Sequence, residues 1–177
     1  MSSTPAEPRW LSDDEQRAWR AYLRGSRLIE EALDQDLQSH GVQLTEYEII
    51  SMLSEAPGRR LRMSTLADLV VQSRSRLTHT ASRLEKRAWV RREACLADKR
   101  GVELVLTEAG WRAVQEMARI HVGSVRRSVL DTMTGEQFKA LGSAMEAVRS
   151  ALAPKGGEHP AVLQEAVEQC VGAEVTA

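Results

Sequence analysis

Residues 73–87 read SRSRLTHTASRLEKR, and this stretch decides the fold class. Ser73 is typical of a helix N-cap, and apolar residues then recur every three or four positions, which predicts a helix to about Arg87. The expected buried edge consists of Leu77, Ala81, Leu84 and Ala88. Successive helical residues turn by about 100°, so the opposite face is polar, basic and almost without acids. That face comprises Ser75, His79, Ser82 and Lys86, with Arg83 beside them and Arg76 and Thr78 on the flanks.

A shorter helix and a hairpin flank this segment. Upstream, Ser64 is a plausible cap for a helix ending near Val70, only a few residues before Ser73. Downstream, residues 90–94 and 102–106 have strand character and enclose a basic turn at residues 98–101. A helix, a tight connection, a polar-faced second helix and a hairpin with a basic tip form the layout of a winged helix-turn-helix.

The rest of the chain is rich in Ala, Leu, Glu and Arg and is expected to be helical. Ser12 starts a long helix that Gly41 ends, and a capping box at residues 45–48, with Leu44 and Ile49 as its staple, starts one over 46–55. Further helices are expected from Thr107 to about residue 130, from residue 134 to about 153, and over 161–170. The fold class is therefore mainly α with a small two-stranded β-wing.

Charge is distributed unevenly along the chain. The whole chain carries a net charge of −1, but the segment from Arg59 to Arg100 holds twelve basic and four acidic residues, a net +8 that leaves −9 for the remainder. A basic middle in an acidic body indicates a polyanionic partner such as nucleic acid, while a merely solvated charged face stays an alternative.

Two segments carry a family resemblance. Residues 74–85, RSRLTHTASRLE, resemble the recognition helix of the MarR family of bacterial regulators, and DKR at 98–100 followed by LVLT at 104–107 resembles its wing. The similarity covers about residues 12–153 and implies a transcription regulator that binds palindromic double-stranded DNA as a homodimer. One departure is Ala88-Trp89, where the family commonly has a glycine and an aliphatic residue, and we interpret it as a packing variant.

DNA contacts are assigned by residue type and position. Arg76 is expected to bond a guanine bidentately in the major groove, and Arg100 at the wing tip suits the minor groove, with Asp98 shaping the turn. For Arg83 the alternative is a structural ion pair with Asp98 or Glu85. The predicted DNA-binding set is Arg62, Ser73, Arg74, Ser75, Arg76, Thr78, His79, Arg83, Lys99 and Arg100; Thr65, Arg91 and Arg92 are weaker candidates.

Dimerisation follows from symmetry and from apolar residues outside the DNA-binding core. Two recognition helices read half-sites about 34 Å apart, one turn of the duplex. In the family the N- and C-terminal helices intertwine. The predicted interface is Trp10, Leu11, Trp19, Phe138, Leu141, Met145 and Leu152. The expected organisation is a flexible N-terminus (1–11), an N-terminal dimerisation helix (12–43), the DNA-binding domain (44–107), C-terminal dimerisation helices (108–153) and an extension (154–177).

Regulation is left open at this level. The resemblance implies release from DNA by a small aromatic or anionic effector, and the candidate pocket is Tyr47, Trp111, Arg119 and His121, although packing along a helix explains aromatic residues more often than ligand contact does. A redox- or metal-responsive regulator is an alternative, but Cys95 and Cys170 match no metal or redox pattern and the histidines form no ligand-spaced cluster, so no metal or cofactor is expected.

Two further classes of function are disfavoured. The sequence has no glycine-rich phosphate loop, no nucleophile elbow and no H-E-x-x-H motif, so we do not expect an enzyme. A winged helix used only for protein contacts conflicts with the basic face of residues 75–83. The first residues resemble neither a secretory signal nor a membrane span, so a cytoplasmic protein without membrane contact is expected.

Overall fold

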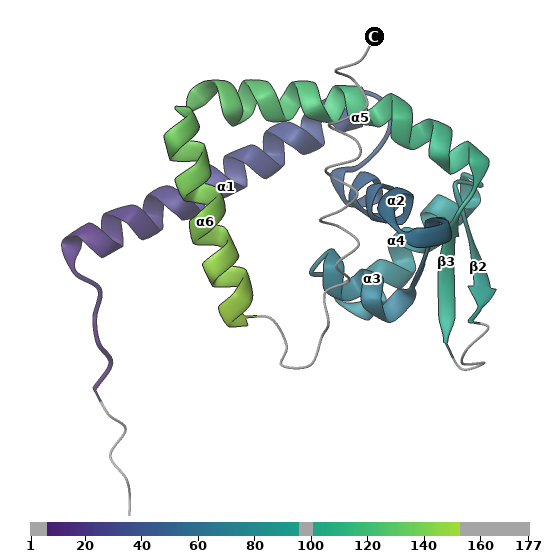
Figure 1. The fold of residues 1–177 in the computed structure, drawn as a ribbon, viewed down its shortest axis with the longest axis horizontal. Helices are drawn as coiled ribbons and strands as arrows, with labels where there is room; N and C mark the ends of the chain where they lie inside the picture. The colour runs from purple at the N-terminus through teal and green to yellow at the C-terminus, as the bar shows by residue number, and fades with distance from the viewer. Residues whose placement is uncertain (1–6, 96–100, 153–177) are drawn as a thin grey trace, which may run out of the picture.

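The computed structural model describes residues 7–95 and 101–152. Two long helices lie side by side at the top of the view, above a body of shorter helices and a small sheet (Figure 1). The helices are α1 (Asp13–Gln38), α2 (Leu44–Glu55), α3 (Met63–Leu69), α4 (Arg74–Lys86), α5 (Glu108–Ser128) and α6 (Gly135–Leu152), with short 3-10 turns at Pro57–Arg59 and Leu130–Thr132. The strands are β1 (Arg60–Arg62), β2 (Val90–Ala94) and β3 (Val102–Leu106).

The predicted fold class is confirmed, with one strand more than expected. The sheet is antiparallel in the order β1-β3-β2, and β1 pairs Leu61 with Leu104. The prediction missed β1 because three residues are too few to show an alternating pattern. The chain enters this strand through a turn in which Gly58 and Arg59 both have positive φ, at 63° and 53°. The predicted helix over 161–170 lies outside the described residues.

Helix caps explain most of the helix starts. The helix starts predicted at Ser12, Ser73 and Thr107 are confirmed, and each of these side chains caps its own helix by accepting a backbone N–H. The one predicted at residues 45–48 was wrong: α2 begins two residues earlier, and the Glu46 carboxylate accepts the Gln43 N–H at 3.1 Å. Ser64 is likewise inside α3, whose cap is Arg62.

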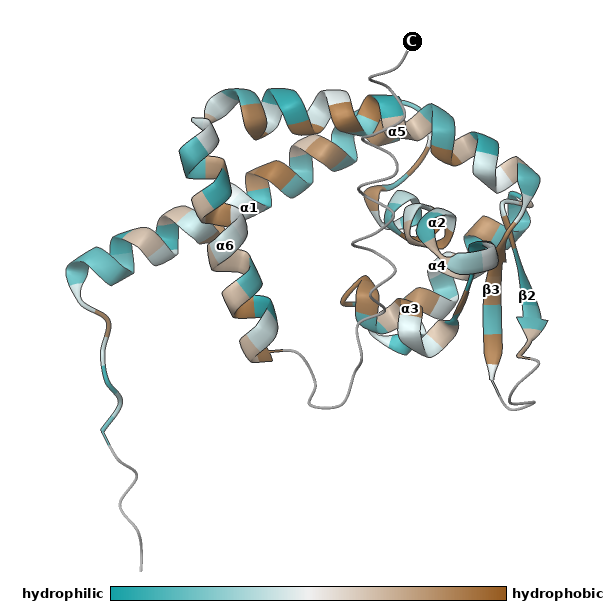
Figure 2. Ribbon diagram, viewed as in Figure 1, coloured by the Kyte–Doolittle hydropathy of each residue, from teal (hydrophilic) through white to brown (hydrophobic). Residues whose placement is uncertain are grey.

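A single core joins the two long helices to the smaller body. Figure 2 shows that hydrophobic residues make up much of β3, and Leu104 and Leu106 of this strand belong to the core. The predicted edge of α4 is confirmed at Leu77, Ala81 and Leu84, which are fully buried. Ala88 is a correction: it is exposed, because α4 ends at Lys86 and the chain turns there with φ at +57°. The largest fully buried side chains include Leu37, Ile49, Ile50, Leu53, Leu66 and Leu104.

The first turn of α5 fits closely against the end of α4. The Thr107 hydroxyl donates to the Ala88 carbonyl at 2.7 Å and accepts the Gly110 N–H at 3.0 Å. A Cβ added at Gly110 would lie 2.1 Å from the Trp89 carbonyl oxygen and 2.7 Å from a Leu106 methyl group. The first turn of α5 can therefore approach residues 89 and 106 this closely only because residue 110 has no side chain.

Gly110→Ala should lower the free energy of unfolding by about 3 kcal/mol, because the methyl group meets backbone that cannot move aside cheaply. Urea unfolding followed by circular dichroism measures the change. Gly142→Ala is the matched control, since its Cβ would meet nothing within 4 Å, and it should stabilise α6 by up to about 1 kcal/mol. If Gly110→Ala and Gly142→Ala changed the free energy of unfolding by the same amount, the close packing of residue 110 would be contradicted.

Candidate nucleic-acid interface

The outward face of α4 is exposed over its first turns. Arg74, Ser75, Arg76, Thr78 and His79 are all exposed, whereas the residues on the other side of the helix are buried. Ser73 ends the preceding turn and accepts the Arg76 N–H through its side chain at 3.3 Å, which fixes the start of the helix. The Thr78 hydroxyl donates to the Arg74 carbonyl at 2.8 Å and keeps its acceptor capacity. The structure therefore leaves all five side chains accessible at the start of α4.

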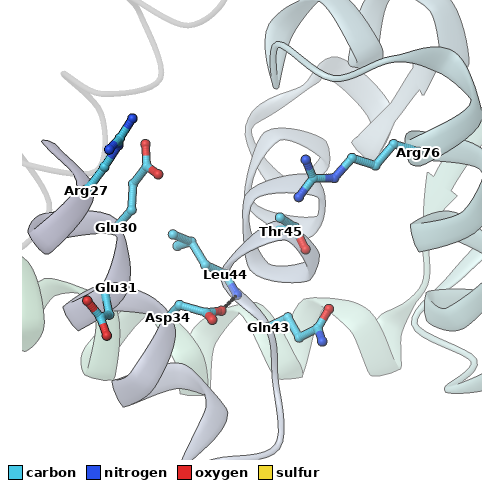
Figure 3. A pocket seen from close by; sticks show the side chains of 8 residues that line it. All are labelled: Arg27, Glu30, Glu31, Asp34, Gln43, Leu44, Thr45 and Arg76. Carbon is cyan, nitrogen blue, oxygen red and sulfur yellow. Dashed lines mark hydrogen bonds between the residues drawn. The ribbon is translucent and has the colours of Figure 1, made fainter. Parts of the chain in front are cut away.

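Arg76 extends from α4 across a cleft of ≈ 520 Å³ (Figure 3). Within the part of the chain that the structure describes, its guanidinium forms no hydrogen bond or ion pair. The opposite wall is α1, which contributes three acids, and the start of α2 forms the floor. The cleft is lined by Arg27, Glu30, Glu31, Asp34, Gln43, Leu44, Thr45 and Arg76. Sequence patterns alone did not indicate that Arg76 borders this cleft.

Charged residues on both walls of the cleft affect the pKa of Glu48, which lies on α2. Burial and the negative charge of Glu30 raise the pKa of Glu48, and the positive charge of Arg76 opposes that increase. The acidic wall of α1 would repel phosphate. Negative charge therefore predominates on the α1 side of the cleft, and the positive charge of Arg76 lies on the α4 side.

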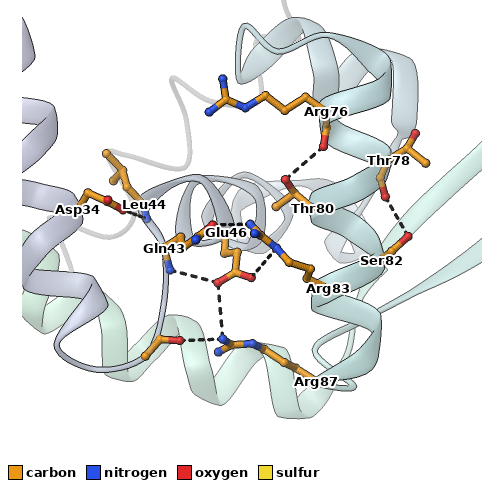
Figure 4. Close-up of polar contacts among 11 residues, drawn as sticks. Asp34, Gln43, Leu44, Glu46, Arg76, Thr78, Thr80, Ser82, Arg83 and Arg87 are labelled. Carbon is orange, nitrogen blue, oxygen red and sulfur yellow. Dashed lines mark hydrogen bonds and ion pairs between the residues drawn. The ribbon is translucent and has the colours of Figure 1, made fainter.

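Arg83 and Arg87 turn inward, toward the start of α2 (Figure 4). Arg83 Nε lies 3.2 Å from Glu46 Oε1, and Arg87 lies 3.7 Å from Glu46 Oε2. Arg83 also donates to the Gln43 side-chain carbonyl, and Arg87 donates to the Gly41 carbonyl at 2.7 Å. Among the described residues Glu46 is thus the acidic partner of Arg83, in place of the predicted Glu85, which pairs with Arg92; Asp98, the other predicted alternative, lies outside the described residues.

The second strand is bonded to α4. Arg92 pairs with Glu85, and it donates to the Thr78 carbonyl at 3.0 Å and to the Ser82 hydroxyl at 3.1 Å. These interactions tie the wing to the recognition helix as one unit. Arg92 is therefore occupied within the protein.

Other basic residues of the sheet face acids. Arg60 lies between Glu93 at 3.3 Å and Glu103 at 3.4 Å. Arg91 donates to Glu93 at 2.6 Å, and this hydrogen bond is the main reason why the pKa of Glu93 is lowered. Thr65 is half-buried at the surface of α3. The predicted wing residues Asp98, Lys99 and Arg100 lie outside the described residues.

Arg62 lies beside a buried cysteine at the base of the wing. Its guanidinium donates to Cys95 Sγ at 3.2 Å, and Cys95 is only 4% exposed. Cys170, the other cysteine of the sequence, falls outside the described ranges. In residues 7–95 and 101–152 no group of three His, Cys, Asp or Glu side chains could hold a metal ion. No helix within those same ranges is long and apolar enough to cross a membrane.

Only two of the four residues of the predicted effector pocket, Tyr47 and His121, are in contact with each other. Tyr47 packs against His121 with ring centroids 4.7 Å apart, and burial raises the pKa of Tyr47 and lowers that of His121. Trp111 lies under the Arg59 guanidinium, 4.2 Å from its carbon, and Arg119 is exposed. Trp111 and His121 are ten residues apart on α5, about 15 Å. The structure therefore does not gather all four around one cavity.

The predicted interface residues are mostly exposed on α1 and α6. Trp10 is 80% exposed and Leu152 is 77% exposed. Trp19 stacks on Tyr22 with centroids 5.6 Å apart, yet both rings remain open to solvent. Phe138 and Met145 are exposed, Leu141 is half-buried, and no residue of α6 is buried. These helices therefore carry apolar surface that the described residues of this chain do not bury.

Comparison with known proteins agrees with this arrangement. The sequence model of the MarR family matches residues 40–101. AbsC, a MarR family transcriptional regulator from Streptomyces coelicolor, is 43% identical, with a TM-score of 0.77 over 82% of this chain and 98% of that one. Sco3205, a second such regulator from that organism, was solved in complex with DNA and is also 43% identical, with a TM-score of 0.79 over 88% of this chain and 98% of its own.

A more distant relative is also a transcriptional regulator. The HTH-type transcriptional regulator PecS of Dickeya dadantii (strain 3937) is 28% identical over 116 residues, which are 64% of this chain and 69% of PecS. Both Streptomyces regulators match over nearly their whole length. The chain belongs to the MarR family of transcriptional regulators.

Proposed function

We propose that this regulator binds duplex DNA as a homodimer, with α4 of each protomer in a major groove. The exposed polar and basic surface at the start of α4 is the observation that carries the proposal. A major groove about 12 Å wide admits one helix, and the N-terminal residues of that helix approach the base edges most closely. The similar regulator Sco3205, solved in complex with DNA, supports the same use of this fold.

Contact roles follow from which side chains are available. Arg76 reads a guanine, and Ser75, Thr78 and His79 meet neighbouring bases, since all four are exposed. Arg74 and Ser73 meet phosphates at the start of the helix. Arg62, Lys99 and Arg100 belong to the wing, where Asp98 shapes the turn and Arg100 enters the minor groove.

The homodimer is supported by the uncovered apolar surface of α1 and α6. Trp10, Trp19, Phe138 and Leu152 are each more than two-fifths exposed, which is costly for a lone chain in water. A twofold partner would cover these residues and would present two α4 helices to a palindrome. Residues 12–43 and 108–153 therefore serve dimerisation, and residues 44–107 serve DNA binding.

Small-molecule release from DNA is a further part of the proposal. The contact between Tyr47 and His121 joins α2 of the DNA-binding part to α5 of the dimerisation part. An aromatic or anionic molecule inserted at that junction would change how the two parts meet. We assign the chain no catalytic activity and a cytoplasmic site of action.

Affinity for random duplex DNA should fall steeply with salt. If each dimer makes six to ten phosphate contacts, affinity should drop by about 10³ to 10⁵ between 50 and 200 mM salt. Filter binding on random duplexes measures this, and the same experiment tests the proposed function. No binding at 50 mM salt would contradict it and would favour a winged helix used only for protein contacts.

Arg76→Ala should weaken binding to the cognate operator by about 1 to 3 kcal/mol and relax the preference at one base pair in each half-site. Operators selected from a random pool by the wild-type protein and by the variant give the comparison. Arg74→Ala is the control, because removal of a side chain that binds phosphate should weaken all sequences alike. A uniform decrease for Arg76→Ala would argue against base reading by Arg76.

A further inference from the structure

We propose that Glu46 is a positioning residue that sets the orientation of α4. In this proposal Arg83 and Arg87 bind Glu46 and so fix α4 against the start of α2, instead of contacting phosphates. This proposal rests on the proposed DNA-binding function. It concerns a residue outside the helix that reads DNA, and it assigns Arg83 a role other than the predicted one. We call the three residues Glu46, Arg83 and Arg87 the clamp.

The clamp supplies a constraint that the apolar edge of α4 lacks. Leu77, Ala81 and Leu84 fix the line along which α4 meets the core, but apolar contacts are not directional. Arg83 and Arg87 are four residues apart and therefore lie on one side of α4, where they hold Glu46 from two successive turns. Hydrogen bonds are directional, and Arg83 donates one to the Gln43 side chain while Arg87 donates one to the Gly41 carbonyl, so the ion pairs with Glu46 and these two bonds together resist rotation of α4 about its own axis.

Burial makes the clamp sensitive to the removal of any member. The Glu46 side chain is only 3% exposed, whereas those of Arg83 and Arg87 are 36% and 38% exposed. A buried carboxylate is destabilised when its positively charged partners are removed. Two guanidinium groups held close together likewise repel each other when the carboxylate between them is removed. Each arginine is further engaged, Arg83 by the Gln43 side chain and Arg87 by the Gly41 carbonyl and the Trp89 ring.

The clamp also connects α4 to α1. Asp34 of α1 accepts the Leu44 N–H at 2.8 Å, Glu46 accepts the Gln43 N–H at 3.1 Å, and both arginines bind the same segment (Figure 4). Residues 41–46 are thus held by a helix assigned to dimerisation on one side and by the recognition helix on the other. The orientation of α4 relative to α1, and hence to a twofold partner, is set at this point.

Misorientation of α4 should affect base reading more than phosphate binding. Hydrogen bonds to base edges require defined geometry, whereas attraction to phosphates tolerates displacement. Disruption of the clamp should therefore lower the affinity for the selected operator and leave that for random duplex nearly unchanged. The ratio of the two affinities separates this effect from a general decrease in folded protein.

The experiment compares Glu46→Gln, Arg83→Gln and Arg83→Lys in the full chain, with Arg74→Gln as the control that removes a phosphate-binding charge. Affinity for a selected operator and for random duplex is measured against salt, well below the unfolding midpoint. The clamp variants should lower the operator-to-random ratio by about tenfold, within the range for coupled positions, without changing the salt slope. Arg74→Gln should reduce the slope by about 0.9 for each phosphate that the protein no longer neutralises.

Arg83→Lys distinguishes the two roles most sharply. Lysine keeps the charge but cannot bridge Glu46 and Gln43 as a guanidinium does, so it should fail as fully as Arg83→Gln. It also leaves Glu46 in place, so the test stands if Glu46→Gln does not fold. A reduced slope for Arg83→Gln, restored by Arg83→Lys, would overturn the proposal, as would an unchanged ratio for all clamp variants. If the wild-type protein did not bind DNA at all, that result would instead contradict the proposed function.

Discussion

The structure depends on one apolar edge of α4. Leu77, Ala81 and Leu84 are completely buried against the core, and burial of each leucine contributes about 1.5 to 3 kcal/mol. A helix with a single apolar edge has only one way to bury it, so its basic side must face outward. The reading surface is therefore a consequence of how this helix packs, and the hydrogen bonds of α4 with the wing and with residues 41–43 refine that placement.

Those hydrogen bonds join the functional parts of the molecule. Arg92 of the wing donates to the Thr78 carbonyl and the Ser82 hydroxyl of α4, and Arg83 of α4 donates to the Gln43 side chain just before α2. The acids of α1 border the cleft that Arg76 spans, so negative charge lies on the dimerisation side and positive charge on the reading side. Such a separation would orient the protein on DNA before any specific contact forms.

Local patterns in the sequence predicted nearly all helices and both long strands. The periodicity of residues 77–84 and the caps at Ser12, Ser73 and Thr107 depend on neighbours within one turn, so they could be recognised without the fold. The short strand β1, the start of α2 and the partner of Arg83 could not. Each depends on residues distant in sequence: Leu61 pairs with Leu104, and Asp34 accepts the Leu44 N–H. Ala88 occupies, at positive φ, the position where the family commonly has glycine.

The most direct test is a crystal structure of the chain bound to an operator selected from random duplexes. We expect two copies of the chain, with residues 74–79 of each against base edges in successive major grooves about 34 Å apart. Residues 83 and 87 should remain on Glu46 in both copies. DNA binding through α4 would be contradicted if the outer face of that helix met protein or solvent while another surface held the duplex.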